Sequence, residues 1–209
     1  MNSTWSLVHA ERAALAADLA DLTDEQWATT SLCAELSVRE VLAHLTAGAV
    51  LSFPRWFLGV LRVRFDFDRQ VVDRLREQLG DSPAETLARF QAAVNRSTTP
   101  LGFRGSSLGA LAEQVVHAED IRRPLGIPRV PPAEVLVAVA EHYASTDLVV
   151  LAKGRIGGLR LVATDTGFAT GEGSEVRGPT LALIMAMTGR AAACAELTGD
   201  GVAELRGRC

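Results

Sequence analysis

Apolar residues recur at alternating steps of three and four along the first two-thirds of the chain, which is the spacing of one face of an amphipathic helix. Turn-forming runs such as Gly80-Asp81-Ser82-Pro83 separate these stripes. The stripes extend from Trp5 to Leu22, Val38 to Phe53, Phe67 to Leu79, Pro83 to Val94 and Ser107 to Ile121. Four to five helices joined by short links predict an up-down helical bundle.

The second predicted helix has a clear start signal and a clear break. Ser37 is followed three residues later by Glu40, which is the pattern of a capping box. We expect the helix that follows to extend to Phe53, where Pro54 would stop or kink it.

The pattern changes after a proline-rich connector at residues 127–132. The elements predicted beyond it are a helix at 133–146, a strand at 159–163, a helix at 179–187 and a strand at 202–205. We therefore expect a mainly α chain, with a helical bundle in residues 1–130 and a small α+β domain in residues 131–209.

The composition is that of an ordinary globular protein. Of 209 residues, 48% are hydrophobic and 22% are charged, and the formal net charge is −4. This mild acidity indicates neither a nucleic acid nor an anionic membrane as a partner, and no apolar run approaches the roughly 18 residues of a membrane span. No signal peptide is recognisable at the start. The three cysteines are widely spaced and form no CxxC pair, which indicates a reducing cytoplasm.

The four histidines are the first candidates for chemistry. His9 and His142 stand among polar and small residues, and surface positions account for them. His44 and His117 instead lie within apolar helical segments. Glu113 precedes His117 by four residues, so both side chains project from the same helix face, one turn apart.

An acidic residue on each side of His117 makes this stripe unusual. Asp120 stands three residues after the histidine, and burying such a line costs free energy unless its members are paired or bind a metal. With His44 from a facing helix, Glu113 and His117 form a two-histidine, one-carboxylate set of the kind that binds metals in bundle cores. Three protein ligands leave a position open, as in catalytic zinc sites. The pattern alone leaves open that these are polar core groups that satisfy one another.

Other catalytic signatures are absent from the sequence, which has no HExxH, no GxSxG and no P-loop. Cys33 precedes a predicted helix start, where a thiol pKa can be lowered, but a half-buried loop residue is the simpler interpretation. Arg122 and Arg123 could hold an anion, but a solvated helix end accounts for them. The stripe around His117 is therefore the main functional hypothesis.

Two segments resemble the motifs of a known family. Trp27 and the run CAELSVREVLAHL at 33–45 resemble the second-helix signature of the mycothiol-dependent maleylpyruvate isomerase family, part of the DinB-like metal-binding bundles. The run EQVVHAEDIRRPLG at 113–126 resembles the last-helix signature of that family. The tail, with its Gly178-Pro179, Gly189-Arg190 and Gly199-Asp200-Gly201 runs, is similar to a small sterol-carrier-like C-terminal domain. One departure is Leu36, which stands where a tryptophan is expected.

The resemblance implies a metal enzyme built on a DinB-like four-helix bundle. It makes His44, Glu113 and His117 the three ligands of a divalent metal, usually zinc, and mycothiol the thiol cofactor. A zinc-bound thiolate would attack a small electrophilic substrate, giving isomerisation or thiol transfer. Such proteins are typically actinobacterial and cytoplasmic. Membership does not fix the reaction, because the bundle hosts several activities.

Two further residues and two alternatives complete the expectations. Asp120 would orient His117 from behind the metal, and Arg190 would bind a carboxylate of the substrate or cofactor, although a surface arginine at a helix end explains Arg190 equally well. The same metal could instead activate water for a thiol-independent hydrolysis, or the chain could be a non-catalytic ligand-binding protein. With no strong second apolar stripe, we expect a monomer or weak homodimer.

Overall fold

The computed structural model describes residues 3–33, 36–99, 107–148 and 150–209. The chain divides into two compact units, Met1–Arg129 and Val130–Cys209. Each unit has its own hydrophobic core.

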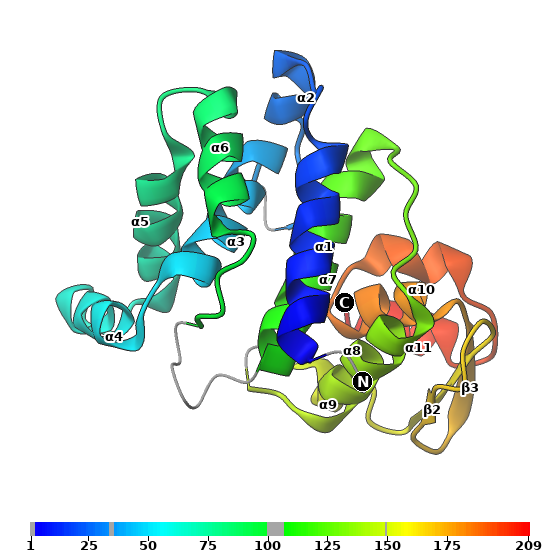
Figure 1. The fold of residues 1–209 in the computed structure, drawn as a ribbon. Coiled ribbons are helices and arrows are strands. Elements are labelled where there is room, and N and C mark those ends of the chain that lie inside the picture. The colour runs from blue at the N-terminus through cyan, green and yellow to red at the C-terminus, as the bar shows by residue number, and fades with distance from the viewer. Residues whose placement is uncertain (1–2, 34–35, 100–106, 149) are drawn as a thin grey trace. The chain divides into compact units, whose positions relative to one another are not determined.

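The described part of the first unit is helical (Figure 1). Its helices are α1 (Thr4–Asp18), α2 (Asp24–Ala28), α3 (Val38–Val50), α4 (Phe53–Arg62), α5 (Phe67–Leu79), α6 (Pro83–Ala93) and α7 (Ser107–Leu125). Helix α3 packs against α5, α6 and α7, and α1 packs against α6 and α7. The predicted bundle is therefore present, with α2 and α4 as short additions to it.

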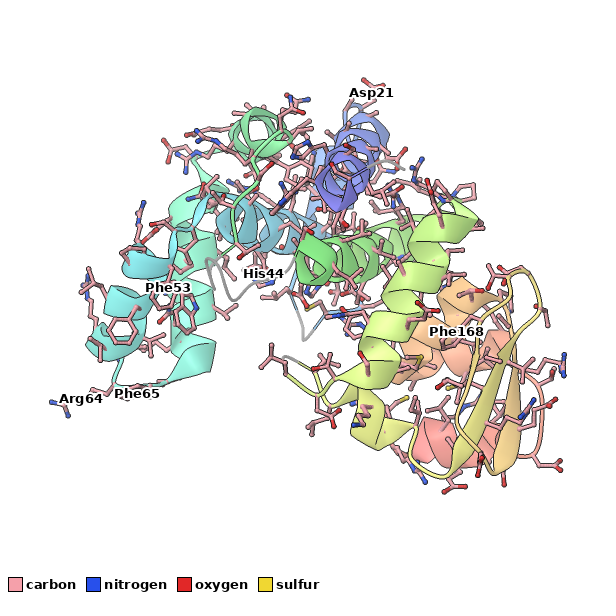
Figure 2. The ribbon with its side chains drawn as sticks, turned by 60° about the horizontal axis from the view of Figure 1, so that its bottom comes forward. Asp21, His44, Phe53, Arg64, Phe65 and Phe168 are labelled. Carbon is pink, nitrogen blue, oxygen red and sulfur yellow. The ribbon has the colours of Figure 1, made fainter. Side chains whose placement is uncertain are left out.

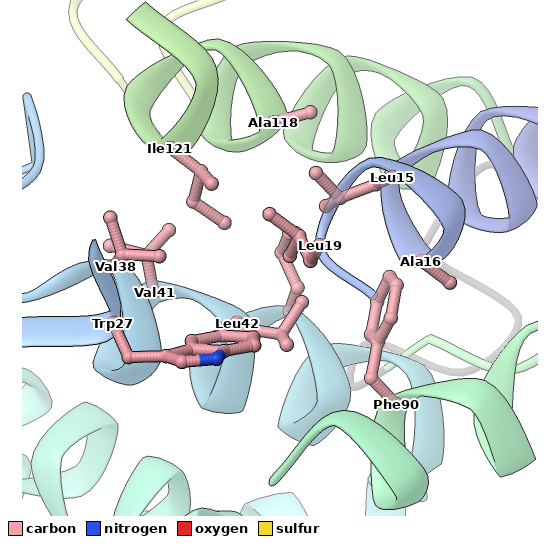
Figure 3. Close-up of a cluster of buried hydrophobic side chains, with 11 residues drawn as sticks. Leu15, Ala16, Leu19, Trp27, Val38, Val41, Leu42, Phe90, Ala118 and Ile121 are labelled. Carbon is pink, nitrogen blue, oxygen red and sulfur yellow. The ribbon is translucent and has the colours of Figure 1, made fainter. Parts of the chain in front are cut away.

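The bundle core is a cluster of side chains from α1, α2, α3, α6 and α7 (Figure 3). Leu15 of α1, Leu42 of α3, Phe90 of α6 and Ile121 of α7 are all fully buried within it. Trp27 of the short helix α2 closes the cluster from one side. Burial of several large apolar side chains, at about 1.5–3 kcal/mol each, is the main stabilising contribution of such a core.

The capping box predicted at the start of α3 is confirmed. The hydroxyl of Ser37 accepts from the backbone N–H of Glu40, and the Glu40 carboxylate accepts from the backbone N–H of Ser37 at 2.8 Å. Both atoms satisfy backbone donors that have no partner inside the helix. This cap fixes where α3 begins and thus the turn of the helix on which His44 stands.

The end of α3 differs from the prediction. The helix stops at Val50 rather than Phe53, and Pro54 lies in the first turn of α4, where its missing N–H costs no hydrogen bond. The chain bends by 120° between α3 and α4. Within the described residues no single helix is long and apolar enough to cross a membrane, and these two reach that length and composition only as a bent pair.

The second unit combines helices with a small sheet. Its elements are α8 (Ala133–Ser145), α9 (Ala152–Arg155), β1 (Leu159–Ala163), β2 (Ala169–Thr170), β3 (Ser174–Gly178), α10 (Thr180–Met187), the 3-10 helix η2 (Ala191–Glu196) and α11 (Val202–Gly207). Strand β1 lies in the middle of the sheet, antiparallel to β2 and parallel to β3. Every residue of α10 is buried, as expected for a helix that is apolar all round. The predicted α+β character is confirmed.

One predicted strand at the C-terminal end is wrong. Residues 202–205 begin the helix α11. Val202 and Leu205 are three residues apart, which places them on one helix face, and Leu205 is fully buried. An ion pair between Glu204 and Arg208, four residues apart, adds to the helix.

Candidate metal centre

The three residues singled out as ligands lie on two facing helices of the first unit. His44 stands in the second turn of α3 (Figure 2), and Glu113 and His117 are one turn apart on α7. Helices α3 and α7 pack against each other, so the two histidine rings meet across the helix interface. The i, i+4 spacing on α7 explains why Glu113 and His117 share a face.

The donor atoms of these side chains are close enough to share one ion. His44, Glu113 and His117 each offer an atom, and these three atoms lie within 4.8 Å of one another. Glu113 Oε2 is 3.4 Å from His117 Nε2. The rings of His44 and His117 meet edge to face, with their centroids 4.9 Å apart.

Asp120 lies behind His117, on the other side of its ring. Its Oδ2 is 2.9 Å from His117 Nδ1, and its side chain is fully buried. A carboxylate at this position accepts a hydrogen bond from Nδ1–H of His117. The other ring nitrogen, Nε2, is then the atom that faces Glu113 and His44 and can bind a metal. The expected position of Asp120 next to His117 is thus observed, whereas its role in a reaction stays a prediction.

Cys33 is a neighbour of this site that its position in the sequence does not reveal. Its thiol, a ring nitrogen of His117 and a carboxylate oxygen of Asp120 all lie within 4.8 Å of one another. The backbone N–H of Leu32 donates to the carbonyl of Asp120 at 3.1 Å, which ties the loop before α3 to α7. No spacing rule connects Cys33 to α7, so only the fold could reveal this proximity.

The environment shifts the pKa values of the two histidines in opposite directions. Burial, and then the charge of His117, lower the pKa of His44 to about 4. Burial also acts to lower the pKa of His117, but its hydrogen bonds raise that pKa well above the usual value, with Asp120 making the largest contribution. At neutral pH the imidazole of His44 is therefore neutral and has a free lone pair for a ligand.

These residues fit a divalent metal of the zinc type. Two imidazoles and one carboxylate are donors that zinc accepts. A buried carboxylate on the outer nitrogen of a ligand histidine is the usual second partner in such sites. The Glu113 side chain is 35% exposed, so a metal or a small molecule can reach its carboxylate from solvent.

Arg122 is not part of a solvated helix end, contrary to the simpler interpretation of the Arg122-Arg123 pair. Its side chain is 1% exposed, and its Nε donates to Asp18 Oδ2 at 2.8 Å. It therefore joins α7 to the end of α1. Arg123 is half-buried and pairs with Glu119 at 3.2 Å.

Arg190 lies in the second unit, directly after α10. Its side chain is half-buried, and its Nη1 donates to the carbonyl of Thr188 at 2.8 Å. A role of Arg190 in the site stays a prediction.

Comparisons with known proteins identify relatives of the chain. The family model of the mycothiol maleylpyruvate isomerase N-terminal domain matches residues 8–122. A comparison with curated proteins finds no match. Among solved structures, a histidine-to-alanine mutant of the mycothiol-dependent maleylpyruvate isomerase matches with a TM-score of 0.59 at 11% identity, over 94% of this chain and 91% of that chain. A second structure of the mycothiol-dependent maleylpyruvate isomerase matches over the same shares, with a TM-score of 0.54 at 12% identity.

The structural likeness, at these identities, concerns the fold, and it confirms the expected mainly helical architecture. The family match concerns the sequence, covers more than half of the chain and includes His44, Glu113 and His117. The resemblance of the two helix motifs is therefore confirmed, and with it the expectation of an enzyme. The chain belongs to the mycothiol maleylpyruvate isomerase N-terminal domain family.

Proposed function

We propose that this chain is a metal-dependent enzyme that uses mycothiol to isomerise a small electrophilic substrate or to transfer the thiol to it. The observation that carries the proposal is the group of three donor atoms from His44, Glu113 and His117 within 4.8 Å. The group lies inside the segment that matches the family model. The cytoplasmic, actinobacterial setting and the monomeric or weakly dimeric state stay predictions.

His44, Glu113 and His117 would hold the metal, and we propose zinc. When bound, the metal would lower the pKa of a coordinated thiol, so that the thiol is deprotonated near neutral pH. His44 requires no deprotonation to act as a ligand, since its pKa is lowered to about 4. Asp120 is a positioning residue in this account, because it holds Nδ1 of His117 and thereby fixes the ring.

We further propose that the two units are separate domains, and that the second is the sterol-carrier-like domain of the family. Arg190 of that unit is proposed to bind a carboxylate of the substrate or of mycothiol, since a guanidinium recognises carboxylates through two parallel hydrogen bonds. An Arg190→Ala variant should then raise KM while metal content stays that of the wild type. Arg190→Lys should restore part of the affinity, because it keeps the charge. An unchanged KM in Arg190→Ala would remove this assignment.

Turnover with and without mycothiol tests the proposed function. Maleylpyruvate, the substrate in the names of the matched structures, is the first compound to assay, followed by other small electrophiles with activated double bonds. Turnover should require mycothiol, be lost in His44→Ala, and persist in His142→Ala, which removes a histidine of the second unit. Turnover without thiol would favour the hydrolase. A chain that carries a copurified apolar ligand and turns over none of these compounds would favour the ligand-binding protein.

A further inference from the structure

Helix α4 exposes large apolar side chains that the first unit does not cover. Phe57 is 45% exposed, Leu58 66% and Leu61 45%, and Phe65 just after the helix is 61% exposed. Exposed apolar residues are ordinary when single, but a cluster of this kind marks an interaction surface.

The apolar side of α4 is buried at one edge and exposed over the rest. Gly59 and Val60 are buried and attach the helix to the unit. Phe53, Phe57 and Leu61 follow one another at steps of four, so they lie on one side of the helix, and all are exposed. Val60 comes three residues after Phe57 and seven after Phe53, so it borders the same side of the helix. The apolar side of α4 is therefore buried only at its edge, and its aromatic part is left to the solvent.

The same segment is basic. Residues 52–65 contain three arginines, Arg55, Arg62 and Arg64, and the first acid after them is Asp66, which accepts from the backbone N–H of Arg69 at 3.0 Å. Arg55 pairs with Glu77 of α5 at 3.0 Å, whereas Arg62 and Arg64 are exposed. The net charge of −4 for the whole chain conceals this local excess of positive charge.

The turn after α4 presents its side chains outward at a conformational cost. Arg64 and Phe65 have φ angles of 55° and 67°, in the left-handed region that glycine adopts most easily. The N–H of Phe65 donates to the carbonyl of Val60 at 3.0 Å, which closes the end of the helix. Figure 2 shows Arg64 and Phe65 at the outer end of this turn. Phe65 and Arg64 thus stand where glycine would be less strained. Residues in such unfavoured backbone conformations are typical of functional sites.

We propose that this surface, formed by α4 and the turn ending at Phe65, binds the face of an anionic lipid bilayer. Phenylalanine and leucine side chains would enter the boundary between headgroups and acyl chains, and the arginines would lie among the phosphates. The two exposed arginines, Arg62 and Arg64, complement the anionic headgroups of such a surface. The helix lies on the membrane in this proposal and does not cross it.

Binding of the full chain to lipid vesicles tests the proposal. Vesicles of phosphatidylglycerol and phosphatidylcholine in equal parts should sediment the protein and shift its tryptophan emission to shorter wavelength, and a Trp56→Phe variant should lose that shift because Trp56 is the tryptophan of α4. Pure phosphatidylcholine vesicles should bind at least about tenfold more weakly, and added salt should weaken binding to the anionic vesicles. The double variants Phe57→Ser/Phe65→Ser and Arg62→Gln/Arg64→Gln should each lose at least about tenfold in affinity.

A matched control uses exposed leucines elsewhere. Leu148 and Leu151 in the second unit are 73% and 69% exposed, and the variant Leu148→Ser/Leu151→Ser should bind as the wild type does. The substituted side chains are all exposed, so far-UV circular dichroism should show an unchanged fold. Absence of binding to the anionic vesicles, or equal binding by all variants, would overturn the proposal. Concentration-dependent self-association that Phe57→Ser/Phe65→Ser abolishes would assign the surface to a second copy instead.

Discussion

Asp120 and His117 form a short, buried hydrogen bond next to the candidate metal centre. The two atoms involved, Oδ2 and Nδ1, are 2.9 Å apart, and the aspartate side chain has no exposure to solvent. A buried carboxylate is costly unless it is paired, so this contact stabilises the imidazole with its proton on Nδ1. The opposite nitrogen, Nε2, is thereby held toward Glu113, 3.4 Å away.

Replacing Asp120 with asparagine should weaken metal binding. The amide has the size of the carboxylate but neither its charge nor its preference for accepting a proton, so His117 loses its fixed orientation. We expect the metal affinity of Asp120→Asn to fall about 10- to 100-fold, measured by competition with a chromogenic chelator. Asp21→Asn, at an exposed position, is the control. Equal affinities for the two variants would show that Asp120 does not position His117.

Metal uptake should release a proton near neutral pH. Burial lowers the pKa of His117, but its hydrogen bonds, chiefly to Asp120, raise that pKa well above its usual value. A metal must displace the Nε2 proton of the protonated ring in order to bind at Nε2. Metal affinity should therefore increase by up to about tenfold per pH unit until the pH exceeds the pKa of His117. Proton release in a weakly buffered solution during metal addition measures the effect. A metal affinity that stays constant from about pH 6 to about pH 8 would contradict the predicted release of a proton.

The same shift makes a prediction for the metal-free chain. A raised pKa in the folded state means that the protonated form of His117 stabilises the fold. This contribution is fully present below the unfolded pKa of about 6.5 and is lost as the pH rises through the folded pKa. Urea unfolding of metal-free protein should therefore show that His117→Gln loses the part of the pH dependence that lies above about pH 6.5. A mutant whose stability profile is parallel to that of the wild type would contradict the assignment.

The two neighbouring arginines at the end of α7 should differ in their effect on stability. Arg122 is 1% exposed and bonded to Asp18, so Arg122→Ala leaves that carboxylate without its partner and opens a cavity. We expect a loss of about 3–5 kcal/mol in the free energy of unfolding. The Arg123 side chain is 24% exposed, and Arg123→Ala should cost about 1 kcal/mol or less. Urea denaturation compares the two, and equal losses would refute the distinction.

Asp165 caps the start of α10 from the loop after β1, and this contribution to stability depends on pH. Asp165 Oδ1 accepts from the backbone N–H of Thr180 at 2.8 Å and from its hydroxyl at 2.6 Å. Desolvation raises the pKa of Asp165, but these hydrogen bonds together lower it below its usual value. Its contribution to stability is therefore present above the unfolded pKa and is lost as the pH falls through the folded pKa.

Asp165→Ala should therefore destabilise the chain by about 1 kcal/mol at neutral pH, the usual cost of a lost cap. The difference from the wild type should shrink below about pH 4, where the carboxylate becomes protonated. Thermal unfolding at neutral pH and at pH about 3.5 measures both effects. A difference that does not depend on pH would show that the charge of Asp165 plays no part.

The sequence predicted those parts of the molecule that local rules govern. Glu113 and His117 could be placed on one face because helix periodicity alone determines it, and the start of α3 because Ser37 and Glu40 form a local cap. The facing position of His44 followed from the expectation of a bundle, since its helix and α7 each bury one side.

Other features depended on contacts between distant segments. The pattern does not predict the helix α4, because Pro54 stops a helix that precedes it but also fits the first turn of a helix that follows. The short strand β3 has a single buried side chain between exposed ones, Val176, which is too weak a pattern to recognise. Cys33 reached the neighbourhood of His117 only through the packing of its loop on α7.

The metal content of the purified chain decides whether His44, Glu113 and His117 form a metal site. Mass spectrometry of the wild type, His44→Ala and Glu113→Ala, with His142→Ala as the control, should find about one equivalent of zinc in the wild type and in the control. Both site variants should lose the metal while circular dichroism shows an intact fold. A wild-type chain that is free of metal and takes up no added zinc would contradict the account and leave His44, Glu113 and His117 as polar groups of the bundle core.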